Sequence, residues 1–464
     1  MRSALPILLG VDVGTARVKA IAAGLDGGEL AHVEQPTPWV HHGANVEMDP
    51  EEFARVVRAV VAEVAFKAGA GSSSGVGVVG IGVAGMAEAG VLVDRRGAPL
   101  NQIFGWHDPR GDVETIRHEI GDDAFHRAVG MPLNAQPSLA KIVWLQRVTP
   151  RLTDASHFLS LPEWAVVCLG GSPVSELSLA SRTGLLDVGE AAPFAGAVAL
   201  VGRNLLSEPV IAGTPAGKAR HEGLPACVLD AVLTVAGHDH QVAALAAGAA
   251  RPNVLFNSLG SAESLARCVE GSLDPPTVGS LAEQGITAGR GVVSGRWGVL
   301  GGLRSGLVLE AIAPLLGAHD RESRRRLSEE ALLLDPADLP AEVLANDEGT
   351  GRVPGLVAGG FSAAAIWAAA VRDLTARSAQ LLERMAVELG PHEHVIVAGG
   401  WAQNGSVIAE KRRRLGDITV SSLREAGSTG AALLAGVAAD ILERPETDPS
   451  PIWSARSFAE REVS

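Results

Sequence analysis

An apolar strand that ends in a cluster of polar residues, near the middle of the chain, restricts the fold more than any other feature. Residues 232–236 read Val-Leu-Thr-Val-Ala, and residues 237–241 read Gly-His-Asp-His-Gln. Residues 242–249 follow and are mostly strong helix formers. This order predicts a strand, a tight turn and a helix. The carboxylate of Asp239 would then lie at the carboxyl end of a strand, where open α/β sheets bind their ligands.

Asp239 allows two interpretations. Asp is favoured at a helix N-terminus, because its carboxylate accepts hydrogen bonds from backbone amides that have no other partner. The same carboxylate could instead face a bound ligand and act on it. The turn by itself does not decide between these roles, so the other motifs of the chain bear on it.

Length and composition limit the class of protein. The chain has 464 residues, too many for one ordinary core, and this length predicts two domains. Its 55 glycines indicate many tight turns and close backbone approaches, as nucleotide-binding α/β folds need. The formal net charge of −14 argues against a nucleic-acid surface, because phosphates require a broad basic face.

The cysteines and the apolar segments point to a compartment. Cys168, Cys227 and Cys268 are isolated and lack metal-ligand spacing, which favours a reduced protein. The N-terminus shows no cleavable signal pattern, and no apolar run reaches membrane length. We therefore expect a cytoplasmic protein without a membrane or nucleic-acid partner.

The first strands of the chain carry an anion-binding pattern. An apolar strand ends at Asp12, and a carboxylate at a buried strand end costs free energy unless a cation or hydrogen bonds satisfy it. Gly14 lets backbone amides approach an anion, while Thr15 and either Arg17 or Lys19 add donors. The pattern predicts a phosphate-binding hairpin, although an ordinary hairpin turn would look similar.

A Gly-x-Gly-x-x-Gly pattern at Gly75, Gly77 and Gly80 does not predict a dinucleotide site. That motif requires its glycines in the turn between a strand and a helix. Here they lie within an apolar strand that continues through residues 81–84. Glu88 follows soon after this strand and is either a surface carboxylate or a ligand contact.

Residues 106–110, Trp-His-Asp-Pro-Arg, combine an indole, a carboxylate and a guanidinium. The indole of Trp106 offers an apolar face, Asp108 can accept hydrogen bonds, and Arg110 can donate them, so the three could contact a polar ligand together. The alternative is an exposed ion pair in a loop, which is common and individually weak.

The second half of the chain repeats the pattern of the first. Two apolar strands flank a turn at Gly260 and Ser261, which predicts another phosphate-type hairpin. A later apolar strand ends at Gly399 and Gly400, and Asn404 follows. The two glycines would let the backbone contact an adenosine, with a helix N-terminus facing phosphate.

Two helices are marked by their end residues. Asp49 followed by Pro50 predicts a helix that runs to about Ala68. Ser362 and Gly390 predict the start and the end of a longer helix with apolar residues at helical spacing.

Together these motifs resemble the FGGY carbohydrate kinases of the actin and hexokinase superfamily. Residues 12–15 match Asp-x-Gly-Thr, residues 106–110 match Trp-x-Asp-x-Arg, and residues 399–404 match Gly-Gly-x-x-x-Asn, in the expected order. The resemblance implies an α/β fold of two actin/hexokinase-type (ribonuclease H-like) domains, with a cleft for ATP and sugar between them. We place the N-terminal domain at residues 1–249 and the C-terminal domain at residues 250–464.

The resemblance also implies roles for individual residues. Asp12 would hold Mg²⁺, and Asp239 would be the general base. The sugar would contact Glu88, Trp106, Asp108, Arg110 and His240. ATP would contact Gly14, Thr15, Arg17, Gly260, Ser261, Gly302, Gly399, Gly400 and Asn404.

Two departures from the family pattern stand out. The usual Thr-Thr-Ser is Thr-Ala-Arg at residues 15–17, which leaves the role of Arg17 open. Glycerol kinases carry Arg before the Glu that corresponds to Glu88, whereas this chain has Ala87. The sequence therefore does not identify the sugar.

The predicted function is an ATP-dependent kinase that uses Mg²⁺ and phosphorylates a hydroxyl of a small sugar or polyol. A pentulose or deoxyketose is among the candidate substrates. The alternative is a non-catalytic, nucleotide-driven regulator that binds sugar on the same fold. Asp239 favours the kinase, because a regulator needs no carboxylate aimed at a hydroxyl. Whether the protein forms a homodimer stays open.

Overall fold

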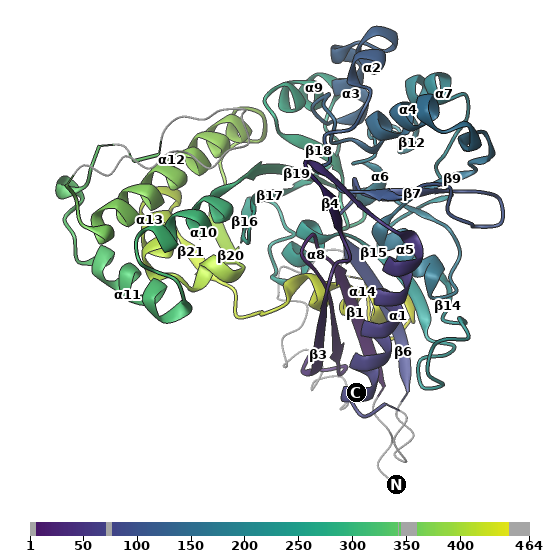
Figure 1. Cartoon of the computed structure of the whole chain (residues 1–464), viewed down its shortest axis with the longest axis horizontal. Coiled ribbons are helices and arrows are strands. Elements are labelled where there is room, and N and C mark those ends of the chain that lie inside the picture. Colours follow the sequence, from purple (N-terminus) through teal and green to yellow (C-terminus); the bar gives the residue numbers. More distant parts are fainter. Residues whose placement is uncertain (1–5, 71–76, 342, 345–359, 445–464) are drawn as a thin grey trace. The chain divides into compact units, whose positions relative to one another are not determined.

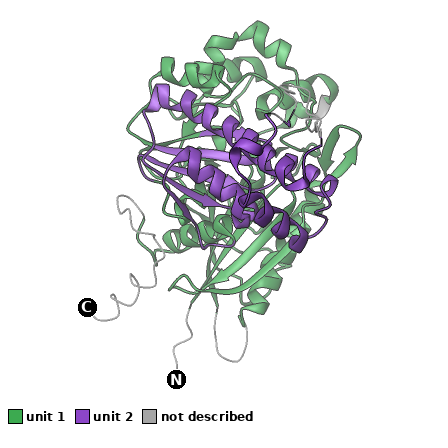
Figure 2. Cartoon of the chain, turned by 90° about the vertical axis from the view of Figure 1, so that its left-hand side faces the viewer, with its two compact units in different colours: residues 1–250, 269–299, 425–464 green, residues 251–268, 300–424 purple. Residues whose placement is uncertain are grey.

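The computed structural model describes residues 6–70, 77–341, 343–344 and 360–444. It consists of two compact units, coloured separately in Figure 2. Unit 1 contains residues 1–250, 269–299 and 425–464, and unit 2 contains residues 251–268 and 300–424. The mixed α/β composition expected from the sequence is confirmed.

The predicted division at residues 249 and 250 differs from the observed units. The chain does enter unit 2 at Arg251, but residues 269–299 and 425–464 belong to unit 1. The helix α14 (Ala426–Ala438) packs on the central sheet of unit 1 and so returns the end of the chain to it. Such a return depends on long-range packing, which no local pattern reveals.

A six-stranded mixed sheet forms the centre of unit 1 (Figure 1). Its order is β14 (Pro215–Lys218), β15 (Val232–His238), β6 (Val78–Gly85), β1 (Ile7–Val13), β2 (Arg17–Ala23) and β3 (Glu29–Pro36). The strands β1, β6 and β15 are parallel, while β2, β3 and β14 are antiparallel to their neighbours. Gly80 therefore lies in a central strand of the sheet, Gly77 directly precedes that strand, and Gly75 lies outside the described residues.

Helices cover both faces of this sheet. Alternate side chains of a strand point to opposite faces. Leu9 and Val83 belong to a core that includes residues of α1 (Pro50–Lys67), whereas Leu8 packs with Ala432 and Ala435 of α14. The predicted N-cap of α1 is confirmed, because Asp49 accepts from the backbone amides of Glu51 and Glu52.

The remaining elements of unit 1 form small sheets and helices beside the central sheet. The short strands are β4 (Val40–His42), β5 (Asn45–Met48), β7 (Gly90–Val93), β8 (Ile103–Phe104), β9 (His157–Ser160), β10 (Ser175–Glu176), β11 (Leu186–Asp187), β12 (Ala192–Pro193) and β13 (Pro209–Val210). Strand β18 (Thr287–Arg290) is instead the edge strand of the other six-stranded sheet, where it neighbours β19 (Arg296–Leu303). The helices are α2 (Val113–Glu119), α3 (Asp122–Val129), α4 (Ser138–Val148), α5 (Leu161–Cys168), α6 (Leu177–Ala180), α7 (Ala195–Val201), α8 (Asp239–Ala246) and α9 (Pro275–Glu283), with one 3-10 turn at Pro150–Asp154.

Unit 2 repeats the central arrangement of unit 1. Strand β16 (Val254–Leu259) pairs antiparallel with β17 (Glu263–Glu270) and parallel with β20 (His394–Ala398), just as β1 pairs with β2 and β6. Strand β21 (Ile418–Val420) pairs parallel with β20. The other elements are β19 (Arg296–Leu303), α10 (Ser305–Leu315), α11 (Arg321–Leu332), α12 (Ala363–Leu389) and α13 (Gly405–Leu415), with 3-10 turns at Pro336–Asp338 and Gly400–Gln403. The predicted long helix is α12, capped by Ser362 and followed by Gly390.

Within the ranges given above, no helix combines the length and the apolar character needed to span a bilayer.

We predict that Gly82→Ala destabilises the fold. A Cβ atom at Gly82 would lie 2.0 Å from the carbonyl oxygen of Ala431 in α14, so the helix or the strand must shift. We expect the free energy of unfolding to fall by about 3 kcal/mol or more. Urea denaturation measures it, with Gly77→Ala as the control, because the nearest atom to a Cβ there is 4.0 Å away. Equal stability of the two variants would contradict the predicted contact.

Candidate active site

The carboxyl ends of three adjacent parallel strands of unit 1 lie level with one another. Val13 of β1 pairs with Gly85 of β6, and Gly85 pairs with His238 of β15. Asp12 lies just before the end of β1, and Asp239 follows the end of β15. The parallel pairing therefore gathers residues far apart in the sequence at one edge of the sheet, the usual ligand site of such folds.

A bulge at Gly237 turns the end of β15. The register with β6 shifts between Val235 and Gly237, and Gly237 has φ +109. A Cβ atom at Gly237 would also lie 2.7 Å from the hydroxyl oxygen of Ser178. Only glycine fits this conformation and this space. The extra residue re-aims the two that follow, as bulges beside functional sites often do.

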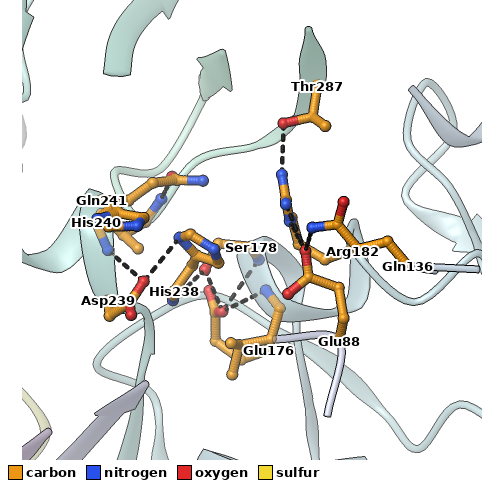
Figure 3. A network of polar contacts seen from close by, with 12 residues as sticks. Glu88, Gln136, Glu176, Ser178, Arg182, His238, Asp239, His240, Gln241 and Thr287 are labelled. Atoms are coloured by element: carbon orange, nitrogen blue, oxygen red, sulfur yellow. Dashed lines mark hydrogen bonds and ion pairs between the residues drawn. The ribbon is translucent and has the colours of Figure 1, made fainter. Parts of the chain in front are cut away.

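Ser178 and Glu176 fix the turn through hydrogen bonds (Figure 3). The backbone amide of His238 donates to Ser178 Oγ at 2.9 Å, and that hydroxyl donates to Glu176 Oε2 at 2.5 Å. Both side chains are fully buried. Burial raises the pKa of Glu176 to about 7, although it accepts from the hydroxyl and amide of Ser178. The segment that carries Asp239 is thus fixed by buried hydrogen bonds.

Asp239 is the first residue of α8, and His238 is its N-cap. Its carboxylate Oδ1 accepts from the backbone amide of His240 at 2.7 Å and lies 3.4 Å from His238 Nδ1. Burial opposes the charge of Asp239, but His240 and His238 hold its pKa below the ordinary value. Asp239 is not the N-cap residue, but its carboxylate still accepts from a backbone amide of the first turn of α8, so it helps to cap the helix, and its role as general base stays a prediction. The side chain is an ionised carboxylate at the end of a strand.

His238 and His240 flank the carboxylate with different exposure. Their rings lie 5.5 Å apart between centroids, and His238 is buried while His240 is half-buried. Burial lowers the pKa of His238 to about 4, so this imidazole is neutral at neutral pH. His238 and His240 thus both lie against Asp239, and a contact of His240 with the sugar stays a prediction.

Asp12 has an unsatisfied buried oxygen. Its Oδ1 is among the buried side-chain oxygens of the described ranges for which the structure has no hydrogen-bond partner. Burial and the nearby charge of Asp239 raise the pKa of Asp12 to about 7. The N-terminal turn of α14 packs closely here, since a Cβ at Gly427 would lie 2.5 Å from Asp12 Oδ2. A carboxylate oxygen without a partner, beside a second carboxylate, suits a hard cation.

The first hairpin orients its two basic residues differently. Lys19 pairs directly across from Asp12, and its Nζ lies 2.8 Å from Glu425 Oε2. Arg17 instead forms a 2.9 Å ion pair with Glu34 at the surface. Of the two donors that the sequence offered for the phosphate, Lys19 lies nearer to Asp12.

Backbone and side-chain hydrogen bonds stabilise the turn of this hairpin. The backbone amide of Gly14 donates to the carbonyl of Arg17 at 3.1 Å and closes the turn. The indole nitrogens of Trp39 and Trp106 donate to Thr15, one to its carbonyl at 2.8 Å and the other to its hydroxyl at 3.0 Å. Trp106 therefore lies at the hairpin.

Asp108 and Arg110 bind each other and the backbone. Asp108 is buried, and its two oxygens accept from the backbone amides of Val46 and Arg110 at 2.7 and 2.9 Å. The guanidinium of Arg110 adds two bonds to Asp108 and lies 2.9 Å from Glu47. Burial opposes the charge of Asp108, but Arg110 holds its pKa below the ordinary value. Asp108 is buried and Arg110 is half-buried, so this is not the exposed ion pair that the sequence also allowed, and a role in sugar binding stays a prediction.

Glu88 is the centre of a second buried cluster, which Figure 3 shows beside Asp239. Its Oε1 accepts from Arg182 Nε and Gln136 Nε2, both at 2.9 Å, and also from Arg182 Nη2. Arg182 Nη1 donates to the hydroxyl of Thr287. Burial opposes the charge of Glu88, but Arg182 holds its pKa below the ordinary value. Glu88 is therefore not the surface carboxylate that the sequence allowed.

In unit 2 the second hairpin and the Gly-Gly turn come together. Gly260 and Ser261 form the tip between β16 and β17, where the amide of Gly260 donates to Ala262 at 3.1 Å. Ser258 near the end of β16 pairs with Ala398 at the end of β20, and Gly399 and Gly400 follow directly. The carboxyl ends of two parallel strands again place both motifs at one edge.

Two further residues of unit 2 differ in their surroundings. Gly302 is exposed in β19, and a Cβ atom there would meet nothing within 4 Å. Asn404 caps α13, and its Oδ1 accepts from the hydroxyls of Ser328 and Ser406 at 2.9 and 2.8 Å and from the amide of Val407 at 3.2 Å. The amide oxygen of Asn404 is thus engaged in folding unit 2. Contacts of both residues with ATP stay predictions.

Sequence reasoning missed Arg182, Gln136, Glu176 and Ser178 as parts of the cluster. One signal for Arg182 was available, because it is the single charged residue between Glu176 and Asp187, in a segment with five Leu or Ala residues. A cation in such a segment needs a buried anion. Gln136 and Glu176 carry no comparable local signal.

The comparison with protein families is decisive at this point. The N-terminal domain of the FGGY family of carbohydrate kinases matches residues 7–246, more than half of the 464 residues. The chain belongs to the FGGY family of carbohydrate kinases.

Curated relatives of this FGGY chain act on different acceptors. A glycerol kinase from Methylorubrum extorquens is 30% identical over 198 residues, which are 38% of each chain. An L-fuculokinase from Salmonella typhi is 27% identical over 271 residues, 54% of each chain. The chain thus matches about two fifths of the length of the first relatives and about half of the fuculokinase.

Solved structures of sugar kinases share the fold over nearly the whole chain. A xyloylose kinase from Brucella ovis superposes with a TM-score of 0.80 at 19% identity, covering 98% of this chain and 97% of that one. Plasmodium falciparum glycerol kinase with ADP gives a TM-score of 0.81 at 17% identity, covering 98% and 92%. The two-domain α/β architecture of FGGY kinases is therefore confirmed.

We predict that Ser178→Ala loosens the turn that carries Asp239. The variant removes the acceptor for the His238 amide and a donor to Glu176, and small displacements of reacting groups are costly. We expect kcat for any accepted acceptor to fall by about 10- to 100-fold, with a smaller change in KM. Steady-state kinetics measure both.

Ser181→Ala is the matched control. Ser181 is also buried and lies one helical turn later, but it bonds Leu177 and Arg290 instead of the turn. Equal kcat losses in both variants would show that Ser178 acts only through general stability.

Proposed function

We propose that this FGGY protein is an ATP-dependent kinase that phosphorylates a hydroxyl group of a small sugar or polyol. The observation that carries the proposal is the gathering of Asp12, Glu88 and Asp239 around the ends of β1, β6 and β15. Family membership and the glycerol, xylulose, fuculose and rhamnulose kinases among the relatives support it.

Asp239 is the proposed general base. The acceptor hydroxyl donates a hydrogen bond to its carboxylate, which orients the oxygen for in-line attack on the γ-phosphorus of ATP. As the new P–O bond forms, the bond to the bridging oxygen of the β-phosphate breaks and ADP leaves. The hydroxyl proton moves to Asp239. The low pKa that His240 and His238 impose keeps the carboxylate ionised before the reaction.

Asp12 is the proposed site for Mg²⁺. Its unpartnered Oδ1 and the neighbouring carboxylate of Asp239 fit a hard cation. In the described ranges, no group of three or more His, Cys, Asp or Glu side chains could hold a metal by itself. Mg²⁺ therefore would depend on the phosphates of ATP as well as on Asp12. When bound, the cation neutralises charge on those phosphates.

ATP would contact both glycine hairpins. We propose Gly14 and Thr15 of unit 1, with Lys19 in addition to or in place of Arg17, as phosphate contacts. In unit 2 we propose Gly260, Ser261, Gly399 and Gly400, because the two turns lie at one sheet edge. The alternative of a non-catalytic regulator draws no support from the comparisons.

We predict that Asp239→Asn reduces kcat by about 10² to 10⁴, the usual contribution of a general base, while the acceptor still binds. A coupled assay of ADP release over pentuloses, hexuloses, deoxyketoses and polyols first identifies an acceptor and then measures kcat. Asp230→Asn is the control, because it removes one negative charge from the exposed turn before β15. Turnover near that of the wild type in Asp239→Asn would exclude the proposed base.

We predict that Asp12→Asn raises the Mg²⁺ concentration for half-maximal activity by about 10- to 100-fold. The variant keeps the shape of the side chain but removes the charge that would attract the cation. Titration of activity with Mg²⁺ at fixed ATP measures this concentration. An unchanged Mg²⁺ requirement would remove Asp12 from the cation site.

A further inference from the structure

Glu88 and Arg182 form a buried ion pair beside the proposed catalytic carboxylate. Glu88 is 4% exposed and Arg182 is 9% exposed. The guanidinium reaches Glu88 Oε1 through both Nε and Nη2, and its third nitrogen donates to Thr287. Gln136 donates to the same oxygen of Glu88 at 2.9 Å. The members come from four separate segments of unit 1.

The pair lies at the same sheet edge as the turn that carries Asp239. Glu88 follows the end of β6 by three residues, and that end pairs with His238 of β15. The charges of Glu88 and Arg182 both act on His238, and the charge of Arg182 also acts on Asp239. Figure 3 shows the pair in one view with His238, Asp239 and His240.

The cations described next to Glu88 already have partners. Arg182 is ion-paired with Glu88. Lys141 is buried, donates to the carbonyl of Ala135 at 2.6 Å and feels the charges of both Asp108 and Glu88. Asp239 adds a further negative charge. An acceptor that carried its own carboxylate would meet Glu88 and Asp239 at close range.

The hydrogen-bonding groups of the pair match hydroxyls. A carboxylate accepts, while a guanidinium and a side-chain amide donate, and a hydroxyl can do both. Two adjacent hydroxyls can therefore bond to Glu88 and Arg182 together, whereas a carboxylate of an acceptor could bond only to the donors.

We infer that Arg182 is a specificity-determining residue and that Glu88 and Arg182 together select an uncharged polyhydroxylated acceptor against sugar acids. This inference rests on the proposed kinase function. The residue before Glu88 is Ala87, so no adjacent arginine accompanies this carboxylate. The guanidinium that reaches Glu88 comes instead from Arg182, just after α6. Glu88 and Arg182 are 94 residues apart in the sequence, so the pair forms only in the folded chain.

The test compares neutral and anionic acceptors in a coupled assay of ADP release. Glycerol, D-xylulose, L-fuculose and L-rhamnulose are the neutral probes, and D-gluconate is the anionic probe. For the wild type we expect kcat/KM of the best neutral probe to exceed that of gluconate by about 100-fold or more. A preference for gluconate would overturn the inference and leave the kinase function standing. If no probe, neutral or anionic, is phosphorylated, both proposals fail.

Variants of the pair separate recognition from folding. Arg182→Met should raise KM for the neutral acceptor by about 10- to 100-fold with a smaller fall in kcat, and Arg182→Lys should recover part of the loss. Glu88→Gln should leave the charge of Arg182 uncompensated. Its ratio of neutral to gluconate kcat/KM should therefore fall by about 10-fold or more.

Arg290→Met is the matched control. Arg290 also ties β18 to the segment around residues 181–189, through the carbonyls of Val188 and Gly189 and the hydroxyl of Ser181, but it does not bond to Glu88. We expect its neutral-to-gluconate ratio to equal that of the wild type. If Arg182→Met and Glu88→Gln lower thermal stability yet keep the wild-type ratio, the pair has a structural role alone and the inference is overturned.

Discussion

The parallel pairing of β1, β6 and β15 is the constraint on which the rest of unit 1 depends. Because Val13, Gly85 and His238 stand level, side chains from three distant stretches of the chain share one sheet edge. The bulge at Gly237 then turns the chain so that Asp239 begins a helix at that edge. A shift of one residue in either pairing would send these side chains to the opposite face.

The charged neighbours of the three carboxylates at this edge give them different pKa values. Desolvation acts on all of them, but their neighbours differ. Asp239 has two histidines and Glu88 has Arg182, so their pKa values fall below the ordinary range. Asp12 has the like charge of Asp239 nearby, and its pKa rises. Similar carboxyl groups at one sheet edge thus differ in pKa, in line with the different roles proposed for them.

The sequence by itself determined the local elements and the order of the motifs. The strand and helix around Asp239 and the starts of α1 and α12 follow from apolar periodicity and capping residues, which are local properties. The repetition of a strand, a glycine turn and a return strand in both halves indicated two similar α/β units. Since each motif is short, its order and spacing along the chain carried the family assignment.

Only the tertiary structure decided which residues share the site and where the units divide. Arg182, Gln136 and Ser178 reach Glu88 and the Asp239 turn through contacts 48 to 94 residues apart in the sequence. The return of α14 to unit 1 likewise rests on close packing against β1 and β6. Apolar periodicity and capping residues indicate which backbone conformation a segment prefers and which face of a helix or strand is buried. The partner of a buried charge is set by which strands pair, and that depends on packing across the whole core.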